Sequence, residues 1–170
     1  MSAMPQSDPL TILLAHDCWA TSQLLGVSRG LSPDQFHQRF DIGPGSLHDT
    51  LTHIIGAMRS WTETLAEVEL RPRLEDDGQH RSPEQLRMLL DETQRELLTE
   101  AHRRPLEQIV SRQLRSGKMI QITRGAVLVH VTTHGMHHRA QCLNMLRRLG
   151  VDPLPQSSVT EWTWAGEVQR

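Results

Sequence analysis

The sequence predicts an all-α fold, a four-helix bundle with a short β-hairpin before the last long helix. Four long segments repeat apolar residues at the 3.6-residue spacing of an amphipathic helix. The segments between them are rich in Gly, Pro and polar residues, as connections between helices are. Of the 170 residues, 37% are hydrophobic and 22% are charged, which is ordinary for a globular protein. Helices with one apolar face bury it against each other, and four such helices make a bundle.

The first predicted helix begins near Pro9 and ends near Arg29, where Gly30 stops it. Its apolar positions are Leu10, Leu13, Leu14, Ala20, Leu24, Leu25 and Val27. The next segment, LSPDQFHQRFDIGPGS, contains Gly and Pro breakers close together and predicts a loop. A second helix follows the N-cap residue Ser46, with Asp49 three residues later in a near match to the capping box. Its apolar stripe is Leu47, Leu51, Ile54, Met58, Trp61 and Leu65.

The third predicted helix follows a polar, turn-rich segment, RPRLEDDGQHRSPEQ. Ser82 and Pro83, followed by Glu84 and Gln85, are typical of a helix start. The apolar residues of this helix are Leu86, Leu89, Leu90, Leu97 and Leu98.

A change of pattern precedes the last helix. The segment IVSRQLRSGKMIQIT alternates in part and has Ser116 and Gly117 at its middle, which predicts a short hairpin. The last long segment, from about Arg124 to Leu149, has a strong helical period and is stopped by Gly150.

Charge and cysteine content exclude several classes of protein. A formal net charge of −2, with charges scattered along the chain, gives no basic stripe, so no nucleic-acid partner is expected. No apolar run approaches the length of a membrane span. The N-terminus MSAMPQSDPL lacks the pattern of a signal peptide, and Cys18 and Cys142 lie far apart, which fits a reducing compartment. We therefore expect a single cytoplasmic domain spanning residues 1–170.

The last helix contains four histidines, at positions 130, 134, 137 and 138. On a helical wheel its inward face is defined by Val127, Val131, Cys142, Met145 and Leu149. His138 falls inside this arc and His134 at its edge, whereas His130 and His137 lie further round. An i, i+4 pair places two imidazoles one above the other, which suits the chelation of one metal ion. His134 and His138 are therefore the candidate ligands from this helix.

A metal site of the catalytic type takes three protein ligands and leaves one position open for water or substrate. His53 on the second helix is the best candidate for the third ligand, although it lies beside the apolar stripe of that helix. A structural interpretation stays open, because a histidine on an apolar face is usually a hydrogen-bonded core residue. An HxxxH pair also occurs by chance.

Five further residues have weaker claims to a site. Cys142 could be an additional soft ligand, but a buried small hydrophobe is the expected role. His16 and His48 could line a pocket, with a surface or capping role as the default. Trp19 and Trp61 are expected to be core anchors, because both lie on amphipathic helices.

Three motifs resemble those of the DinB-like metal-binding family. GSLHDTLTHIIGAMRSW is similar to the second-helix motif, HVTTHGMHHRAQCLNMLRRLG to the fourth-helix motif and AHDCWA to the first-helix pattern. The resemblance implies a four-helix bundle of the DinB-like type, often dimeric, in which His53, His134 and His138 hold one metal ion. A homodimer is therefore expected, and a monomeric elution profile in size-exclusion chromatography would contradict it.

Some DinB-like proteins are S-transferases or isomerases that depend on bacillithiol, mycothiol or glutathione. Three neutral nitrogen ligands leave a bound ion strongly Lewis-acidic, and the chain has no obvious nucleophile of its own. The leading hypothesis is therefore an enzyme whose divalent metal, zinc or nickel, activates a low-molecular-weight thiol for attack on an electrophile. The small-molecule substrate is not defined by the sequence.

Two other functions stay open. One is a metal-dependent binding or stress-response protein without turnover. The other is a metal hydrolase, which ranks lower because no HExxH arrangement supplies a general base. Gln141 could orient a ligand, and Asp49 could hold an imidazole near the metal. The alternative is that these two residues only join helices or cap one.

Overall fold

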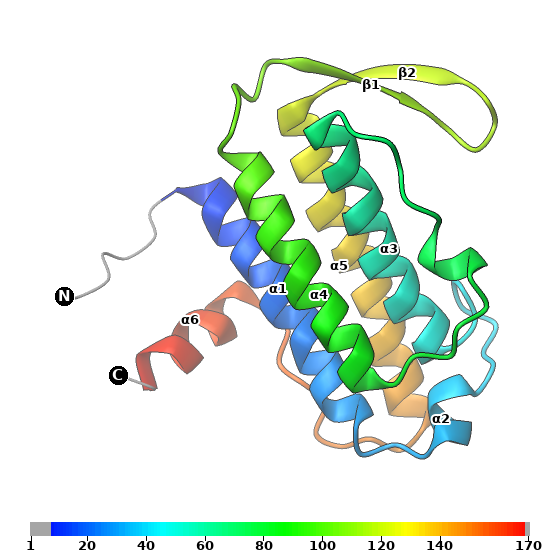
Figure 1. Cartoon of the computed structure of the whole chain (residues 1–170). Coiled ribbons are helices and arrows are strands. Elements are labelled where there is room, and N and C mark those ends of the chain that lie inside the picture. The colour runs from blue at the N-terminus through cyan, green and yellow to red at the C-terminus, as the bar shows by residue number, and fades with distance from the viewer. Residues whose placement is uncertain (1–7, 169–170) are drawn as a thin grey trace.

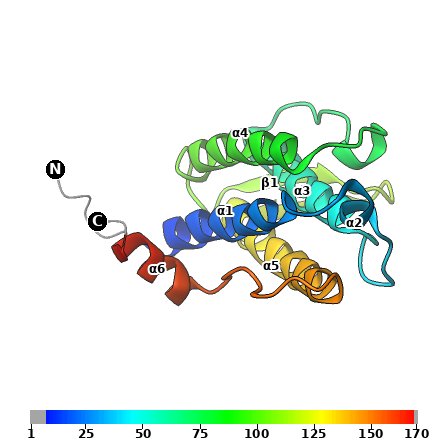
Figure 2. The same ribbon diagram turned by 90° about the horizontal axis from the view of Figure 1, so that it is seen from below.

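The computed structural model describes residues 8–168, so most of the segment that was inspected for a signal peptide lies outside the described residues. Four long helices form a bundle (Figure 1; Figure 2). They are α1 (Pro9–Ser28), α3 (Leu47–Ala66), α4 (Pro83–Ala101) and α5 (Arg124–Arg148). Helices α1 and α3 each pack against both α4 and α5. The predicted four-helix bundle is confirmed.

The predicted apolar stripes form the core. All six stripe residues of α3 are buried, and so are Leu86, Leu90 and Leu97 of α4. On α5, four of the five predicted inward residues are buried and Leu149 packs against them. Leu13 of α1 is instead 41% exposed, because adjacent helical residues point about 100° apart and its neighbour Leu14 takes the core position.

Three short elements were not predicted: α2 (Pro33–His37), the 3₁₀ turn η1 (Leu74–Asp76) and α6 (Val159–Val168). The prediction of a plain loop after α1 is wrong at α2. There, Ser32 accepts a hydrogen bond from the backbone of Gln35, and the Gln35 side chain accepts one from the backbone of Ser32. This capping box stabilises a helix of five residues, which is too short to show a helical period.

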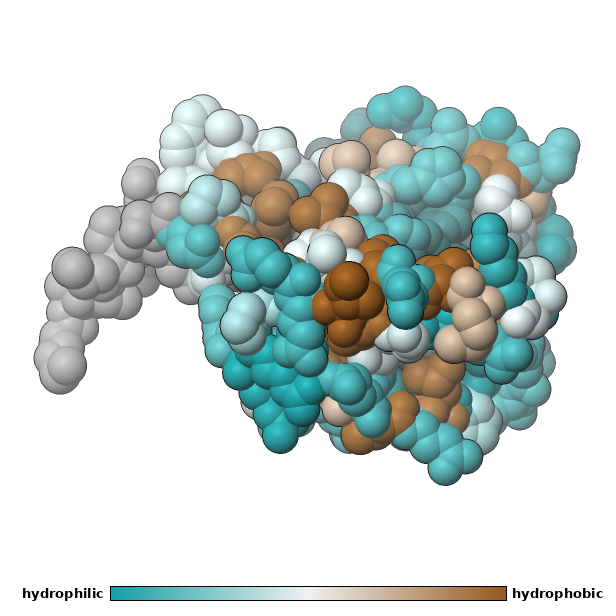
Figure 3. All heavy atoms as spheres, turned by 90° about the horizontal axis from the view of Figure 1, so that it is seen from above, coloured by the Kyte–Doolittle hydropathy of each residue, from teal (hydrophilic) through white to brown (hydrophobic). Residues whose placement is uncertain are grey.

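The predicted hairpin is present as β1 (Ile109–Gln113) and β2 (Met119–Thr123), which pair antiparallel. It lies across one end of the bundle, with β1 against α3 and β2 against α5 (Figure 1). Val110 points into the core and is 2% exposed. Seen from above the bundle, apolar areas alternate with polar ones, and no single apolar patch covers this face (Figure 3). No helix among residues 8–168 is long and apolar enough to cross a membrane.

One buried cation joins the ends of three helices. Arg124, at the start of α5, is 1% exposed. Its guanidinium donates to the backbone carbonyls of Leu65 and Glu100, at 2.5 and 2.6 Å. These carbonyls lie in the last turns of α3 and α4, where the helix dipoles concentrate negative charge. Arg124 therefore fixes the end of the bundle that the hairpin covers.

We expect Arg124→Met to lower the free energy of unfolding by about 3 kcal/mol, because it leaves the buried carbonyls of Leu65 and Glu100 without their charged donor. Urea unfolding followed by circular dichroism measures this change. Arg148→Met, at an exposed position on the last turn of the same helix, is the control and should change stability by less than about 0.5 kcal/mol. Equal losses in the two variants would contradict the role given to Arg124.

Candidate metal centre

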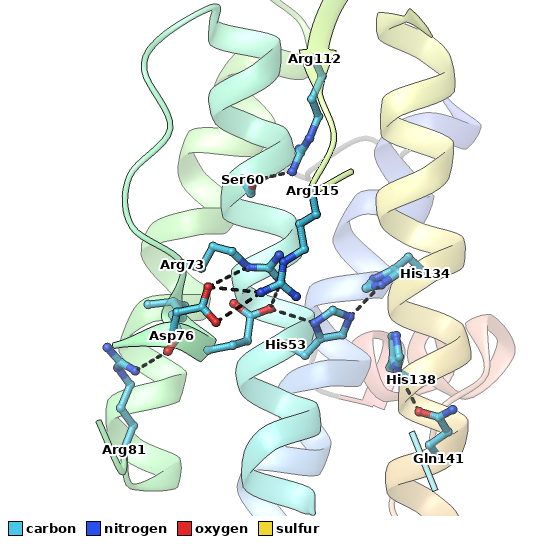
Figure 4. Close-up of polar contacts among 12 residues, drawn as sticks. His53, Ser60, Arg73, Asp76, Arg81, Arg112, Arg115, His134, His138 and Gln141 are labelled. Carbon is cyan, nitrogen blue, oxygen red and sulfur yellow. Dashed lines mark hydrogen bonds and ion pairs between the residues drawn. The ribbon is translucent and has the colours of Figure 1, made fainter. Parts of the chain in front are cut away.

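The bundle brings His53 of α3 together with His134 and His138 of α5 (Figure 4). One ring nitrogen from each of the three lies within 4.8 Å of the others. The ring centroids are 4.9 Å apart for His53 and His134, 4.7 Å for His53 and His138, and 4.5 Å for the helical pair. The edge of the α3 stripe on which His53 lies faces α5, which is why a residue beside the stripe can reach the pair. We call these three residues the triad.

The carboxylate of Glu75 determines which nitrogen of His53 carries the proton. Nδ1 of His53 lies 2.9 Å from Oε1 of Glu75, which comes from η1. Burial raises the pKa of Glu75, but hydrogen bonds from His53, Arg73 and its own backbone hold it at about 2. Glu75 is therefore an anionic acceptor and Nδ1 of His53 is the donor. The lone pair of His53 Nε2 is left directed towards α5.

His138 is oriented in the same way by an amide. Oε1 of Gln141 lies 2.8 Å from Nδ1 of His138, so the ring donates from Nδ1 and keeps its Nε2 lone pair free. The amide nitrogen of Gln141 lies 3.1 Å from Nε2 of His137. Gln141 thus contacts one of the triad imidazoles, that of His138.

The distances within the triad fit a metal ion. Nε2 of His53 and Nε2 of His134 are 3.1 Å apart. Two nitrogens that bind one zinc ion at about 2.0–2.1 Å in a tetrahedral site are about 3.3 Å apart. Burial lowers the pKa of His134 to about 3, with further lowering from the neighbouring imidazoles, and burial also lowers the pKa of His138. Both rings are neutral at ordinary pH, which is the state that binds a metal.

Two glycines leave room for the residues that orient the triad. A Cβ atom at Gly56 would lie 2.8 Å from the Glu75 carboxylate, and one at Gly43 would overlap the Gln141 amide. Gly43 also has a φ of +50°, a region that favours glycine. The positions of Glu75 and Gln141 therefore depend on close backbone approach.

Asp49 lies elsewhere than expected. Its carboxylate contacts Arg39 and the Nδ1 of His48, and its backbone N–H donates to Ser46. The carboxylate that contacts His53 is Glu75, 22 residues further along the chain. The spacing of Asp49, one turn before His53, suggested the wrong partner. Glu75 was missed because the segment LEDD looks like any solvated polar loop.

A second histidine cluster consists of His37, His48 and His80, which also lie close enough to hold a metal ion. Both nitrogens of His48 are engaged, since Nδ1 contacts Asp49 and Nε2 accepts the backbone N–H of Arg81 at 3.1 Å. His48 is 5% exposed, so the surface role expected by default is wrong for this residue. Its bond to Arg81 ties the loop before α4 to α3, which is a structural role.

The other candidates have structural positions. Cys142 is fully buried, and burial raises its pKa to about 12, so it is a small hydrophobe as expected. Nε2 of His16 lies 3.0 Å from the carbonyl of Ser157. Trp61 is buried, as predicted, whereas Trp19 is only partly buried and lies against the His16 ring.

Two cavities adjoin the triad and share His53, Arg73 and Glu75. The larger, which we call the wide cavity, has a volume of about 410 Å³ and is also lined by His48, His80 and Arg115. The other, which we call the narrow cavity, has a volume of about 150 Å³ and is also lined by Trp61, Arg112 and His134. A cavity of about 670 Å³ between α3 and α4 has none of the triad in its lining. The triad is therefore reached through the wide and narrow cavities.

A four-helix bundle whose inner face carries three converging imidazoles defines the class of this protein, a helical protein with a candidate metal centre. The chain belongs to the DinB family, whose model matches residues 4–168. It is 24% identical to "Protein DinB" of Bacillus subtilis over 150 residues, which cover 84% of this chain and 87% of the relative.

A solved structure supports the same fold. The crystal structure of a putative member of the DinB family from Exiguobacterium sibiricum matches with a TM-score of 0.61 at 17% identity, over 89% of this chain and 96% of the other. The predicted family and fold are thus confirmed. The homodimer stays a prediction, because the structure describes a single chain.

We expect Glu75→Gln to weaken metal affinity by about 10- to 100-fold, because the amide no longer acts as an anionic acceptor for His53. Competition with a chromogenic chelator measures this affinity. Asp76→Asn is a matched control, because Asp76 contacts only arginines in its salt bridges. Asp49→Asn tests the residue that the sequence favoured as the partner of a metal-binding imidazole. A larger loss of metal affinity in Asp49→Asn than in Glu75→Gln would contradict the role of Glu75 as the partner of His53.

Proposed function

We propose that this chain is a metal-dependent enzyme in which His53, His134 and His138 hold one divalent ion, zinc or nickel, and a low-molecular-weight thiol is transferred to an electrophile. The observation that carries the proposal is the convergence of three imidazoles beside two cavities. A divalent ion with three neutral ligands and an open position is a Lewis acid that lowers the pKa of a bound thiol or water. The triad supplies the ligands, and Glu75 and Gln141 hold two of its rings in the ligating tautomer.

The chain's own thiols are unsuited to nucleophilic attack. Cys18 is 5% exposed and Cys142 is fully buried, and burial raises the pKa of each to about 12. Both side chains are therefore protonated and closed to solvent at neutral pH. A nucleophile for group transfer has to come from outside the protein. In such a transfer the external sulfur bonds to the electrophilic carbon, the thiol proton passes to solvent, and the leaving group departs with its bonding electrons.

The hydrolase alternative receives less support. Glu75, which lies against His53, is bonded to His53 and Arg73, and its pKa is about 2. A carboxylate with so low a pKa is a weak base for water at neutral pH. The non-catalytic binding protein stays as the second candidate, because the triad accounts for metal binding without a reaction.

Metal content tests the first half of the proposal. We expect about one zinc or nickel ion per chain by elemental analysis, and nearly none in His134→Ala, because two imidazoles on separate helices hold an ion poorly. His37→Ala is the control, since this residue belongs to the second cluster. Equal metal content in the native protein and His134→Ala would remove the site.

Thiol dependence tests the second half. We expect the metal-loaded protein to consume a chromogenic electrophile with a rate that depends on one of a panel of low-molecular-weight thiols. Replacing all three triad residues by alanine should lower that rate by about a hundredfold or more, since Lewis-acid activation contributes several kcal/mol. If no thiol gives a rate above that of the triple variant, the non-catalytic binding protein is the better account.

A further inference from the structure

We propose that the narrow cavity binds a carboxylate group of the ligand that reaches the triad, and that Arg112 is the residue that recognises it. This inference rests on the proposed function and names a substrate class for the same site. Its basis is an arginine whose charge is balanced by no carboxylate, placed in a cavity that His53 and His134 also line.

Arg112 differs from the other three arginines that line the narrow cavity, because it pairs with no carboxylate. Four arginines face two glutamates there, Glu63 and Glu75. Three of the arginines form ion pairs with carboxylates: Arg59 and Arg71 with Glu63, and Arg73 with Glu75. Among residues 8–168, Arg112 forms no ion pair. Its terminal nitrogens donate to the hydroxyl of Thr64 at 3.2 Å and to that of Ser60 at 2.8 Å, and Figure 4 shows the contact with Ser60. Arg112 is therefore a cation of the narrow cavity without an ion-pair partner.

Arg112 is held in place for recognition. Its guanidinium lies 4.0 Å from the centre of the Trp61 ring, and its Nε is buried with no hydrogen-bond partner. A guanidinium has five N–H groups, so the bonds to Ser60 and Thr64 leave one N–H on each terminal nitrogen. Two N–H groups on one rigid fork match the two oxygens of a carboxylate. Burial lowers the pKa of Arg112, and the charge of Arg73 lowers it further, whereas the charge of Glu63 opposes the shift.

The size of the cavity limits what it can hold. A volume of about 150 Å³ corresponds to about five water molecules, enough for a carboxylate and an adjoining carbon or two. The remainder of a larger ligand has the wide cavity of about 410 Å³, which His53 also lines. The alternative is that Arg112 only fastens β1 to α3 through Ser60, Thr64 and Trp61. That role would affect stability but would not distinguish a charged ligand from a neutral one.

The test compares two simple thiols that differ in charge. The protein is loaded with cobalt(II), and mercaptoacetate or 2-mercaptoethanol is titrated while the sulfur-to-cobalt charge-transfer absorption is recorded. We expect Arg112→Gln to weaken mercaptoacetate about 10- to 100-fold, the usual loss for a hydrogen bond to a charged group, and to leave 2-mercaptoethanol unchanged. Arg112→Lys, which keeps the charge, should recover part of the loss. Urea unfolding of each variant separates this effect from a loss of fold.

Acetate distinguishes the source of the carboxylate. If Arg112→Gln weakens acetate binding to the cobalt protein but not mercaptoacetate binding, the carboxylate belongs to a second substrate and not to the thiol. If Arg115→Gln, in the wide cavity, has the larger effect, or if Arg112→Gln weakens both thiols equally, the proposal is overturned. If the protein takes up no cobalt, the proposed metal function fails by itself. Acetate titration followed by tryptophan fluorescence then still tests the cavity, because Arg112 stacks on Trp61.

Discussion

The site depends on three imidazoles whose nitrogens converge on one point between α3 and α5. Lone pairs directed at one another repel unless a proton or a cation lies between them. His53 and His138 cannot turn away from that point without losing their hydrogen bonds to Glu75 and Gln141. The Nε2 lone pairs of His53 and His138 are therefore held towards the centre of the triad, and this is the physical reason for proposing a metal ion there.

The rest of the fold keeps this geometry in place. One helix supplies two rings at i, i+4, and the helix packed beside it supplies the third. Arg124 bonds to the last turns of α3 and α4, so the start of α5 is fixed relative to both. Glu75 comes from a short turn, yet Gly56 lets it approach the backbone of α3 closely. Rigid helices thus position the ligands, and the loop contributes one carboxylate that is bonded at several points.

The sequence predicted the features that depend on residues close together in the chain. It missed the features that depend on contacts between distant residues. The stripes of α3 and α5, the hairpin and the pairing of His134 with His138 rest on local periodicity, and the structure places them as predicted. His53 was the best candidate for the third ligand, but periodicity ranked it below the pair, because an edge position on a helix does not show which neighbour it faces. Glu75 could not be found, since its contact with His53 joins residues 22 positions apart through an irregular segment. Asp49 was favoured by spacing alone, and its nearest cation and imidazole proved to be Arg39 and His48.

The distribution of charge links the metal centre to what it binds. The chain as a whole carries a formal charge of −2, so its surface does not attract anions in general. In the narrow cavity beside the triad, however, Arg112 has no carboxylate partner, and the imidazoles add no negative charge of their own. A divalent ion in such a centre would keep its full charge next to Arg112. An anionic ligand would then be attracted by both the metal ion and Arg112. This attraction is confined to the cavity, because charges over the rest of the surface are screened. A site built from neutral ligands and an arginine without a carboxylate partner therefore selects for negative charge in its ligand.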